Sequence, residues 1–371
     1  VLKNWIELQH SYECFYFVAD WHALTTHYED PSIIAESGRD MVIDWLAAGV
    51  NPGNSTLFVQ SRIPEHAELF TLLSMITPLG WLERVPSYKD QQEKLKDRDL
   101  ATFGFLGYPL LQSADILMYR AGFVPVGEDQ VAHVELTREI ARRFNHFYGS
   151  EPDFEDKVNV AIRKMGKKNA KLYQNARKRY QEQGDTEALA IGGALLDSQQ
   201  NISLSDRERL LGYLDGEGRI ILPEPQSLLT VSSKMPGTDG QKMSNSYNNT
   251  IALREDPDSV VRKIKTMPTD PARVRRTDPG DPKKCPVWEF HQVYTDEATK
   301  AELAIGCIDC KQYVIDSILD ELKPIQQRVA EYVGDLAAVD AIINEGCEAA
   351  RDVAQDTMEE VRKVMGLSGR K

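Results

Sequence analysis

The first sixty residues alternate between helix-like and strand-like patterns of hydrophobic positions. The run from Cys14 to Ala19 is short, aromatic and β-branched, which predicts a buried strand. Amphipathic spacing predicts a helix over Leu2 to Gln9 and another over Ile33 to Ala48, and the apolar run Ser55 to Gln60 predicts a second strand. This alternation is typical of a parallel α/β sheet. Because many nucleotide-binding folds share it, the chemistry has to be inferred from side chains.

The remaining chain changes character several times. Residues 103 to 149 place polar side chains inside apolar context and are the expected pocket, whereas residues 151 to 222 are rich in Lys, Arg, Gln, Glu and Ala with helical spacing. A loop is expected over 235 to 249, a linker over 269 to 286 and helices over 311 to 366. We therefore predict an α/β catalytic domain at 1–150, a helical insertion at 151–222, the rest of the catalytic domain at 223–268 and a mostly helical domain at 269–371.

Composition limits the possible classes of protein. The chain has 371 residues, 42% of them hydrophobic and 27% charged, and no apolar run long enough for a membrane helix. Since no secretory signal is visible, we expect a cytoplasmic protein without a membrane partner. The formal charge of -13 argues against coating nucleic acid by bulk electrostatics, so DNA is not an expected partner, but a local basic face could still bind RNA.

The loop Gly240-Gln-Lys-Met-Ser-Asn-Ser246 carries the sharpest chemical signal. A lysine and hydroxyls on a glycine-led loop suit a triphosphate, although such a loop can also be a solvated turn. The string Lys-Met-Ser-Asn-Ser resembles the KMSKS signature of class I aminoacyl-tRNA synthetases in its tryptophanyl variant. Further blocks are similar to tryptophanyl-tRNA synthetases in the same order: 61–68, 81–90, 108–119 and 126–145.

The resemblance implies a fold and a reaction. It implies a Rossmann-like catalytic domain, a helical anticodon-binding domain and a homodimer. The reaction would join L-tryptophan to tRNA(Trp) through tryptophanyl adenylate, with ATP and Mg²⁺ as co-substrate. A tyrosine-specific relative and a catalytically impaired paralogue that binds tRNA or protein are the alternatives.

Asp115 lies in an otherwise apolar helical segment, where a carboxylate is costly unless it has a partner. An N-capping or ion-paired aspartate would explain it without function. By resemblance, Asp115 accepts the indole N–H of tryptophan, Tyr108 and Gln130 hold the ammonium and carboxylate groups, and His22 is a pocket histidine.

The resemblance also assigns the ATP site. Lys242, Ser244 and Ser246 would act on the phosphates as catalytic groups, with Met243 and Asn245 in the same nucleotide-binding loop. Gly127, Glu128 and Asp129 match the ribose contact, and Met235 matches the backbone contact to adenine. The HIGH-like signature normally precedes the segment that matches Val1 to Trp5, so we expect an upstream segment with this signature and the first strand of the sheet.

Two further features stay open at this level. Five cysteines in a chain without an export signal are expected to be reduced thiols or metal ligands. Cys285, Cys307 and Cys310 resemble part of a four-cysteine iron–sulfur cluster found in some of these synthetases, but Lys300 stands where another cysteine would fall. Basic residues between 163 and 179 are either a solvated helix face or a contact to the tRNA backbone: Arg163, Lys164, Lys167, Lys168, Lys171, Arg177 and Lys178.

Overall fold

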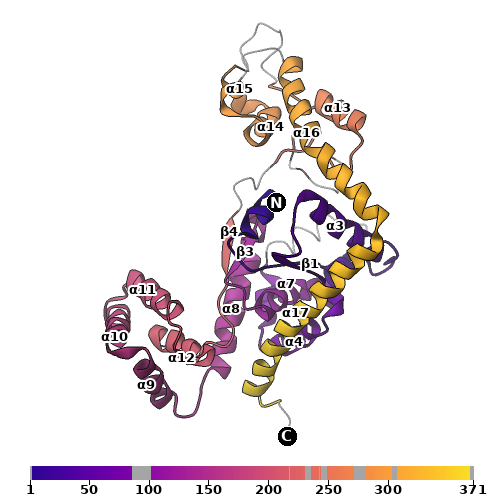
Figure 1. Ribbon diagram of the computed structural model, residues 1–371. Coiled ribbons are helices and arrows are strands. Elements are labelled where there is room, and N and C mark those ends of the chain that lie inside the picture. Colours follow the sequence, from indigo (N-terminus) through magenta and orange to yellow (C-terminus); the bar gives the residue numbers. More distant parts are fainter. Residues whose placement is uncertain are drawn as a thin grey trace. The chain divides into compact units, whose positions relative to one another are not determined.

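The computed structural model describes residues 2–85, 102–216, 218–229, 235–241, 243, 249–270, 281–302 and 307–367 (Figure 1). Contacts between Cα atoms divide the chain into two compact units. The first contains Val1–Val18, Ser32–Val59 and Leu229–Cys347, and the second contains Ala19–Pro31, Gln60–Leu228 and Glu348–Lys371.

A parallel pair of strands lies in the first unit. β1 (Cys14–Val18) and β2 (Ser55–Val59) pair in parallel from Cys14 opposite Ser55 to Val18 opposite Val59. α1 (Leu2–Leu8) precedes β1, and α3 (Ile34–Ala48) connects the two strands. A Cβ added to Gly38 of α3 would lie 3.0 Å from Val18 Cγ1, so glycine permits the close approach of this helix to β1. The predicted α/β arrangement is confirmed, with element bounds within one residue at each end.

Helices build a second core in the same unit. α13 (Pro257–Thr266), α14 (Pro286–Tyr294) and α16 (Cys307–Gly334) enclose buried residues that include Val260, Ile264, Phe290, Val314 and Ile318. The 3-10 helix η4 (Pro282–Lys284) and α15 (Glu297–Glu302) complete this region, and α17 (Leu336–Val364) continues into the second unit. Most of the predicted linker, residues 271–280, lies outside the described residues.

The second unit is organised around one apolar helix, α7 (Phe103–Met118). Thr102 caps its N-terminus by accepting a hydrogen bond from Phe105 N at 3.2 Å. Its neighbours are α2 (Asp20–His27), α4 (Glu65–Ser74), α5 (Leu79–Glu83) and α8 (Val131–Tyr148). The 3-10 helices η1 (Gln60–Arg62) and η2 (Glu128–Gln130) precede α4 and α8, and β3 (Phe123–Val126) pairs with β4 (Gln226–Leu229).

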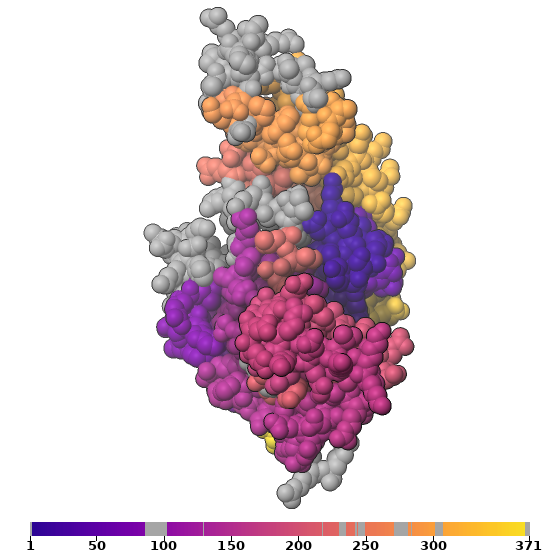
Figure 2. All heavy atoms as spheres, turned by 90° about the vertical axis from the view of Figure 1, so that its left-hand side faces the viewer, coloured from indigo at the N-terminus to yellow at the C-terminus, as the bar shows by residue number. Residues whose placement is uncertain are grey.

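Residues 154–215 form a helical group with a core of its own. It contains α9 (Phe154–Lys164), α10 (Gly166–Gln183), α11 (Thr186–Asp197) and α12 (Leu204–Asp215). Tyr173 is fully buried at its centre and donates its hydroxyl hydrogen to Leu210 O at 2.5 Å. Figure 2 shows the outer surface of this group in magenta to pink.

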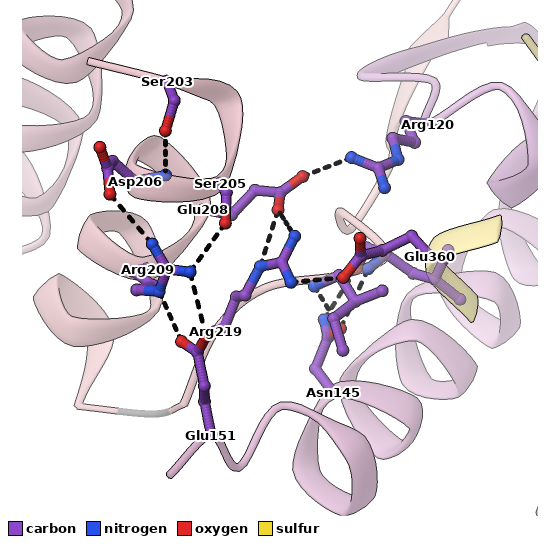
Figure 3. A network of polar contacts seen from close by, with 12 residues as sticks. Arg120, Asn145, Glu151, Ser203, Ser205, Asp206, Glu208, Arg209, Arg219 and Glu360 are labelled. Carbon is purple, nitrogen blue, oxygen red and sulfur yellow. Dashed lines mark hydrogen bonds and ion pairs between the residues drawn. The ribbon is translucent and has the colours of Figure 1, made fainter. Parts of the chain in front are cut away.

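Arginines and carboxylates form a buried polar cluster in the second unit (Figure 3). Arg219 donates to Glu208 at 2.9 Å from Nε and also to Glu360 of α17, while Arg120 donates to the other oxygen of Glu208. Nearby, Arg209 bonds both oxygens of Glu151. Among the residues that the structure describes, no helix combines the length and apolar character needed to cross a membrane.

Candidate active site

A polar stripe runs along one face of α7. Tyr108, Gln112, Asp115 and, directly after the helix, Tyr119 are spaced by four, three and four residues, which places them on the same side of the helix. Asp115 is 2% exposed. A carboxylate in such a position is stable only when hydrogen-bond donors replace its lost water.

Side chains of three residues surround Asp115 with hydrogen-bonding groups. Gln60 Nε2 donates to Oδ1 at 2.8 Å and His66 Nδ1 donates to the same oxygen at 2.6 Å. His22 Nε2 lies 2.7 Å from Oδ2. Gln60 and His22 follow the carboxyl ends of β2 and β1 along the chain, where polar residues of parallel α/β folds commonly meet ligands.

Hydrogen bonds keep Asp115 ionised despite its burial. Burial raises the pKa of the carboxyl, but hydrogen bonds and electrostatic attraction from His22 and His66 together lower it by more, so the pKa lies below its ordinary value. The ionised carboxylate can only accept hydrogen bonds. Counting the described residues, two groups reach Oδ1 and one reaches Oδ2, so Oδ2 has room for one further donor.

Two histidines bridge pairs of residues on the α7 stripe. His66 of α4 joins Asp115 to Tyr119, whose hydroxyl oxygen lies 2.7 Å from His66 Nε2. His133 of α8 joins Gln112 Oε1 at 2.6 Å to the hydroxyl oxygen of Tyr108 at 3.3 Å. Both rings are almost fully buried, at 0% and 1% exposed.

The orientation of Gln60 leaves one polar atom without a partner. Its Nε2 faces the carboxylate of Asp115, so its Oε1 faces away, and this buried oxygen has no hydrogen-bond partner among the described residues. A buried acceptor left unpaired costs about 1–3 kcal/mol. The Gln60 amide is therefore oriented to donate to Asp115, even though this orientation leaves its own oxygen without a hydrogen bond.

The structure brings three of the residues predicted to bind substrate together. The His22 and Tyr108 rings meet edge to face with centroids 6.4 Å apart, and His22 contacts Asp115. Gln130 ends η2, three residues before His133, and its backbone N donates to Gly127 O at 3.0 Å. Gly127 and Glu128 form the turn between β3 and α8; the side chain of Asp129 lies outside the described residues.

The predicted phosphate loop is described only in part. Gly240 has a φ of 80°, a conformation that favours glycine, and a Cβ there would lie 2.8 Å from Pro268 Cγ. Met243 N donates to Met235 O at 3.2 Å, and both methionine side chains pack against the helical core of the first unit. Lys242, Ser244, Asn245 and Ser246 lie outside the described residues.

The cysteines give the iron–sulfur hypothesis no support. Cys310 Sγ lies 3.0 Å from His291 Nε2, and burial lowers the pKa of His291 to about 4. Cys285, Cys307 and Cys310 are not joined by disulfides among the described residues. Within the described ranges, no group of three or more His, Cys, Asp or Glu side chains is arranged to hold a metal ion.

Sequence reasoning gave no role to His66, Gln60, Tyr119 or Gln112. The spacing of Tyr119 and Gln112 from Asp115 is a helical signal that could have identified both. His66 and Gln60 lie 49 and 55 residues before Asp115, and only tertiary packing brings them to it.

A nearly fully buried carboxylate that meets polar groups from three separate elements is typical of the ligand site of an α/β enzyme. A family model described as tRNA synthetases class I (W and Y) matches residues 1–169 and 188–313. The chain therefore belongs to this family of class I tRNA synthetases.

Individual relatives cover nearly the whole chain. The tryptophan–tRNA ligase of Ralstonia nicotianae is 64% identical, covering 99% of this chain and 94% of that protein. A protein of the same name from Thermotoga maritima is 42% identical, covering 99% and 93%. A crystal structure of tryptophanyl-tRNA synthetase from Campylobacter jejuni, complexed with ADP and tryptophan, matches with a TM-score of 0.71 at 25% identity, covering 99% of this chain and 94% of that one.

Proposed function

We propose that this protein is an ATP-dependent ligase that joins L-tryptophan to tRNA(Trp). The tryptophan carboxylate attacks the α-phosphorus of ATP and pyrophosphate leaves; a ribose hydroxyl at the end of the tRNA then attacks the carbonyl carbon of tryptophanyl adenylate and AMP leaves. Full-length similarity to enzymes named for this reaction supports the proposal. The observation that carries it is the ionised, buried Asp115 with one acceptor position left at Oδ2.

Asp115 would select tryptophan by accepting its indole N–H. Phenylalanine lacks that donor and would leave the carboxylate short of a hydrogen bond, and comparable sites reject such analogues by roughly 10⁴ to 10⁵. Tyr108 and Gln130 would hold the ammonium and carboxylate groups. His22, which contacts both Asp115 and Tyr108, would fix the two relative to each other.

ATP would enter with Mg²⁺ on its phosphates, as class I synthetases use it. We assign the ribose contact to Gly127, Glu128 and Asp129 and the adenine contact to Met235. Lys242, Ser244 and Ser246 would stabilise the charge that develops on pyrophosphate as it leaves, with Met243 and Asn245 in the same loop.

A basic surface would bind the tRNA backbone. Lys167, Lys168 and Lys171 are exposed at the start of α10, whereas Lys164 pairs with Asp206 at 2.6 Å.

The proposal also includes the division of the chain into four domains that the sequence predicts, assembly as a homodimer, and a location in the cytoplasm.

Amino-acid-dependent pyrophosphate exchange, followed by aminoacylation of purified tRNA(Trp), tests the function. We expect exchange with tryptophan and ATP, with tyrosine and phenylalanine at least 10³-fold weaker in kcat/KM. Exchange that depends on tyrosine, or no exchange with any amino acid, would contradict the proposal.

A further inference from the structure

His66 has a place in the site that none of the assigned residues explains. Its ring is completely buried, Nδ1 contacts the Asp115 carboxylate and Nε2 contacts the Tyr119 hydroxyl. We infer that His66, locked by Tyr119, is a positioning residue that sets Asp115 as an acceptor for a single substrate N–H. This inference rests on the proposed function.

The orientation of the His66 ring follows from its two partners. Because an ionised carboxylate only accepts hydrogen bonds, His66 Nδ1 donates to Oδ1 of Asp115. On the other side of the ring, Nε2 lies 2.7 Å from the Tyr119 hydroxyl oxygen. Tyr119 thereby holds the ring with Nδ1 towards Asp115.

Saturation of Oδ1 determines where a ligand can bind. This oxygen receives both the Gln60 amide and the His66 ring, so its in-plane acceptor directions are occupied. The two bonds come from different elements, η1 and α4, and oppose rotation of the carboxylate. The remaining acceptor direction at Oδ2 is therefore fixed, as discrimination by one hydrogen bond requires.

An amino acid without the indole N–H separates this role from a purely structural one. In β-(3-benzothienyl)alanine, sulfur replaces the indole nitrogen while the ring shape is nearly kept. An enzyme that has lost the orientation of Asp115 should lose rate with tryptophan but not with this analogue. An enzyme that is merely less stable should lose rate with both.

His66→Asn is the principal variant. The asparagine amide can reach towards the carboxylate but cannot bridge to Tyr119. We expect kcat/KM in pyrophosphate exchange to fall about 10-fold or more for tryptophan and less than about twofold for the analogue, since one hydrogen bond to a charged group is affected. Tyr119→Phe should produce the same selective loss at about threefold, and it tests the inference if His66→Asn does not fold.

Thr137→Val is the matched control. Ser113 of α7 and Thr137 of α8 share a buried hydrogen bond at 2.8 Å between their hydroxyl oxygens, and neither side chain bonds the carboxylate of Asp115 in the described part of the chain. Loss of this hydrogen bond in Thr137→Val should lower the thermal stability of the protein. It should leave the ratio of kcat/KM for tryptophan to kcat/KM for the analogue unchanged.

The outcomes separate the inference from the function beneath it. The inference would be overturned, while the function stands, if both His66→Asn and Tyr119→Phe lost rate equally with the two amino acids. It would also be overturned if neither variant lost rate with either amino acid. A wild-type enzyme that activates the analogue as well as tryptophan would instead refute the assignment of Asp115, and the inference with it.

Discussion

Two buried polar clusters in the second unit are built in different ways. Around Asp115, one carboxylate meets the Gln60 amide and the rings of His66 and His22, and among the described residues one acceptor position at Oδ2 receives no donor. Around Arg219, charges of both signs bond one another through several pairs at once. Paired arginines and carboxylates satisfy their own burial and leave little capacity for a ligand.

The elements that each cluster joins differ as well. The Arg219 cluster ties α12 through Glu208 to α17 through Glu360 and to Arg120 just after α7. Burial lowers the pKa of Arg219, but the hydrogen bonds and charges of Glu208 and Glu360 together raise it more, so the guanidinium stays charged. The comparison teaches that a buried charge points to function when its hydrogen bonding is incomplete.

Asp115→Ala should have the largest effect, because it removes the acceptor around which the first cluster is built. We expect the KM for tryptophan to rise strongly and discrimination against phenylalanine in kcat/KM to fall by on the order of 10³ or more. Pyrophosphate exchange with each amino acid measures this. If the variant still discriminated against phenylalanine as wild type does, Asp115 would not contact the substrate. The two clusters would then not differ in function.

Glu208→Gln should have the opposite profile. It leaves Arg219 and Arg120 without the buried carboxylate that both contact, and breaking such a pair costs about 3–5 kcal/mol of unfolding free energy. Urea unfolding should report that loss, while the KM for tryptophan stays within about twofold of wild type. Glu139→Gln, at an exposed pair with Arg142, is the control and should cost less than about 0.5 kcal/mol. A changed KM with unchanged stability would show that the Arg219 cluster belongs to the substrate site.

Lys242→Ala should affect the chemical step without touching either cluster. We expect the rate of pyrophosphate exchange at saturating substrates to fall about 10²-fold, because the ammonium meets charge that develops on the leaving phosphates. The dissociation constant for tryptophan, measured by calorimetry, should change less than threefold. Gln241→Ala in the same loop is the control. A pure loss of tryptophan affinity would contradict the assigned role.

Local patterns in the sequence predicted the strands and marked Asp115 as unusual, but its role came from the family resemblance, and its long-range partners could not be predicted. β1, α3 and β2 follow from periodicity within a few residues, and Asp115 was conspicuous because a carboxylate interrupts an apolar helix. His66 reaches Asp115 across 49 residues, and Arg219 reaches Glu360 across 141. In the sequence such residues look like ordinary surface polar groups, since nothing local records which charges will be buried together.

Glu151 should show the smallest effect, visible only as a pH dependence of stability. Hydrogen bonds from Arg209 are the main cause that lowers its pKa from 4.5 to about 2, against the opposing effect of burial. A carboxyl whose pKa is lower in the folded state stabilises the fold above its unfolded pKa, and this contribution disappears as pH falls towards the folded pKa. Because the side chain is partly exposed, we expect Glu151→Gln to cost only about 1–2 kcal/mol at pH 7. The difference from wild type should hold down to about pH 5 and vanish between about pH 4.5 and 2.

Urea unfolding of wild type and Glu151→Gln at pH 7, 5 and 3 measures this difference. Glu135→Gln is the control, because Glu135 pairs with Arg138 one turn away on an exposed face and should contribute little at any pH. A Glu151 difference that stays constant to pH 3 would mean that packing, not the charge of the carboxylate, accounts for its contribution. In that case Glu151 and Arg209 would stabilise the fold by packing, as ordinary surface residues do. The contrast with the cluster around Asp115 would then rest on Glu208 and Arg219 alone.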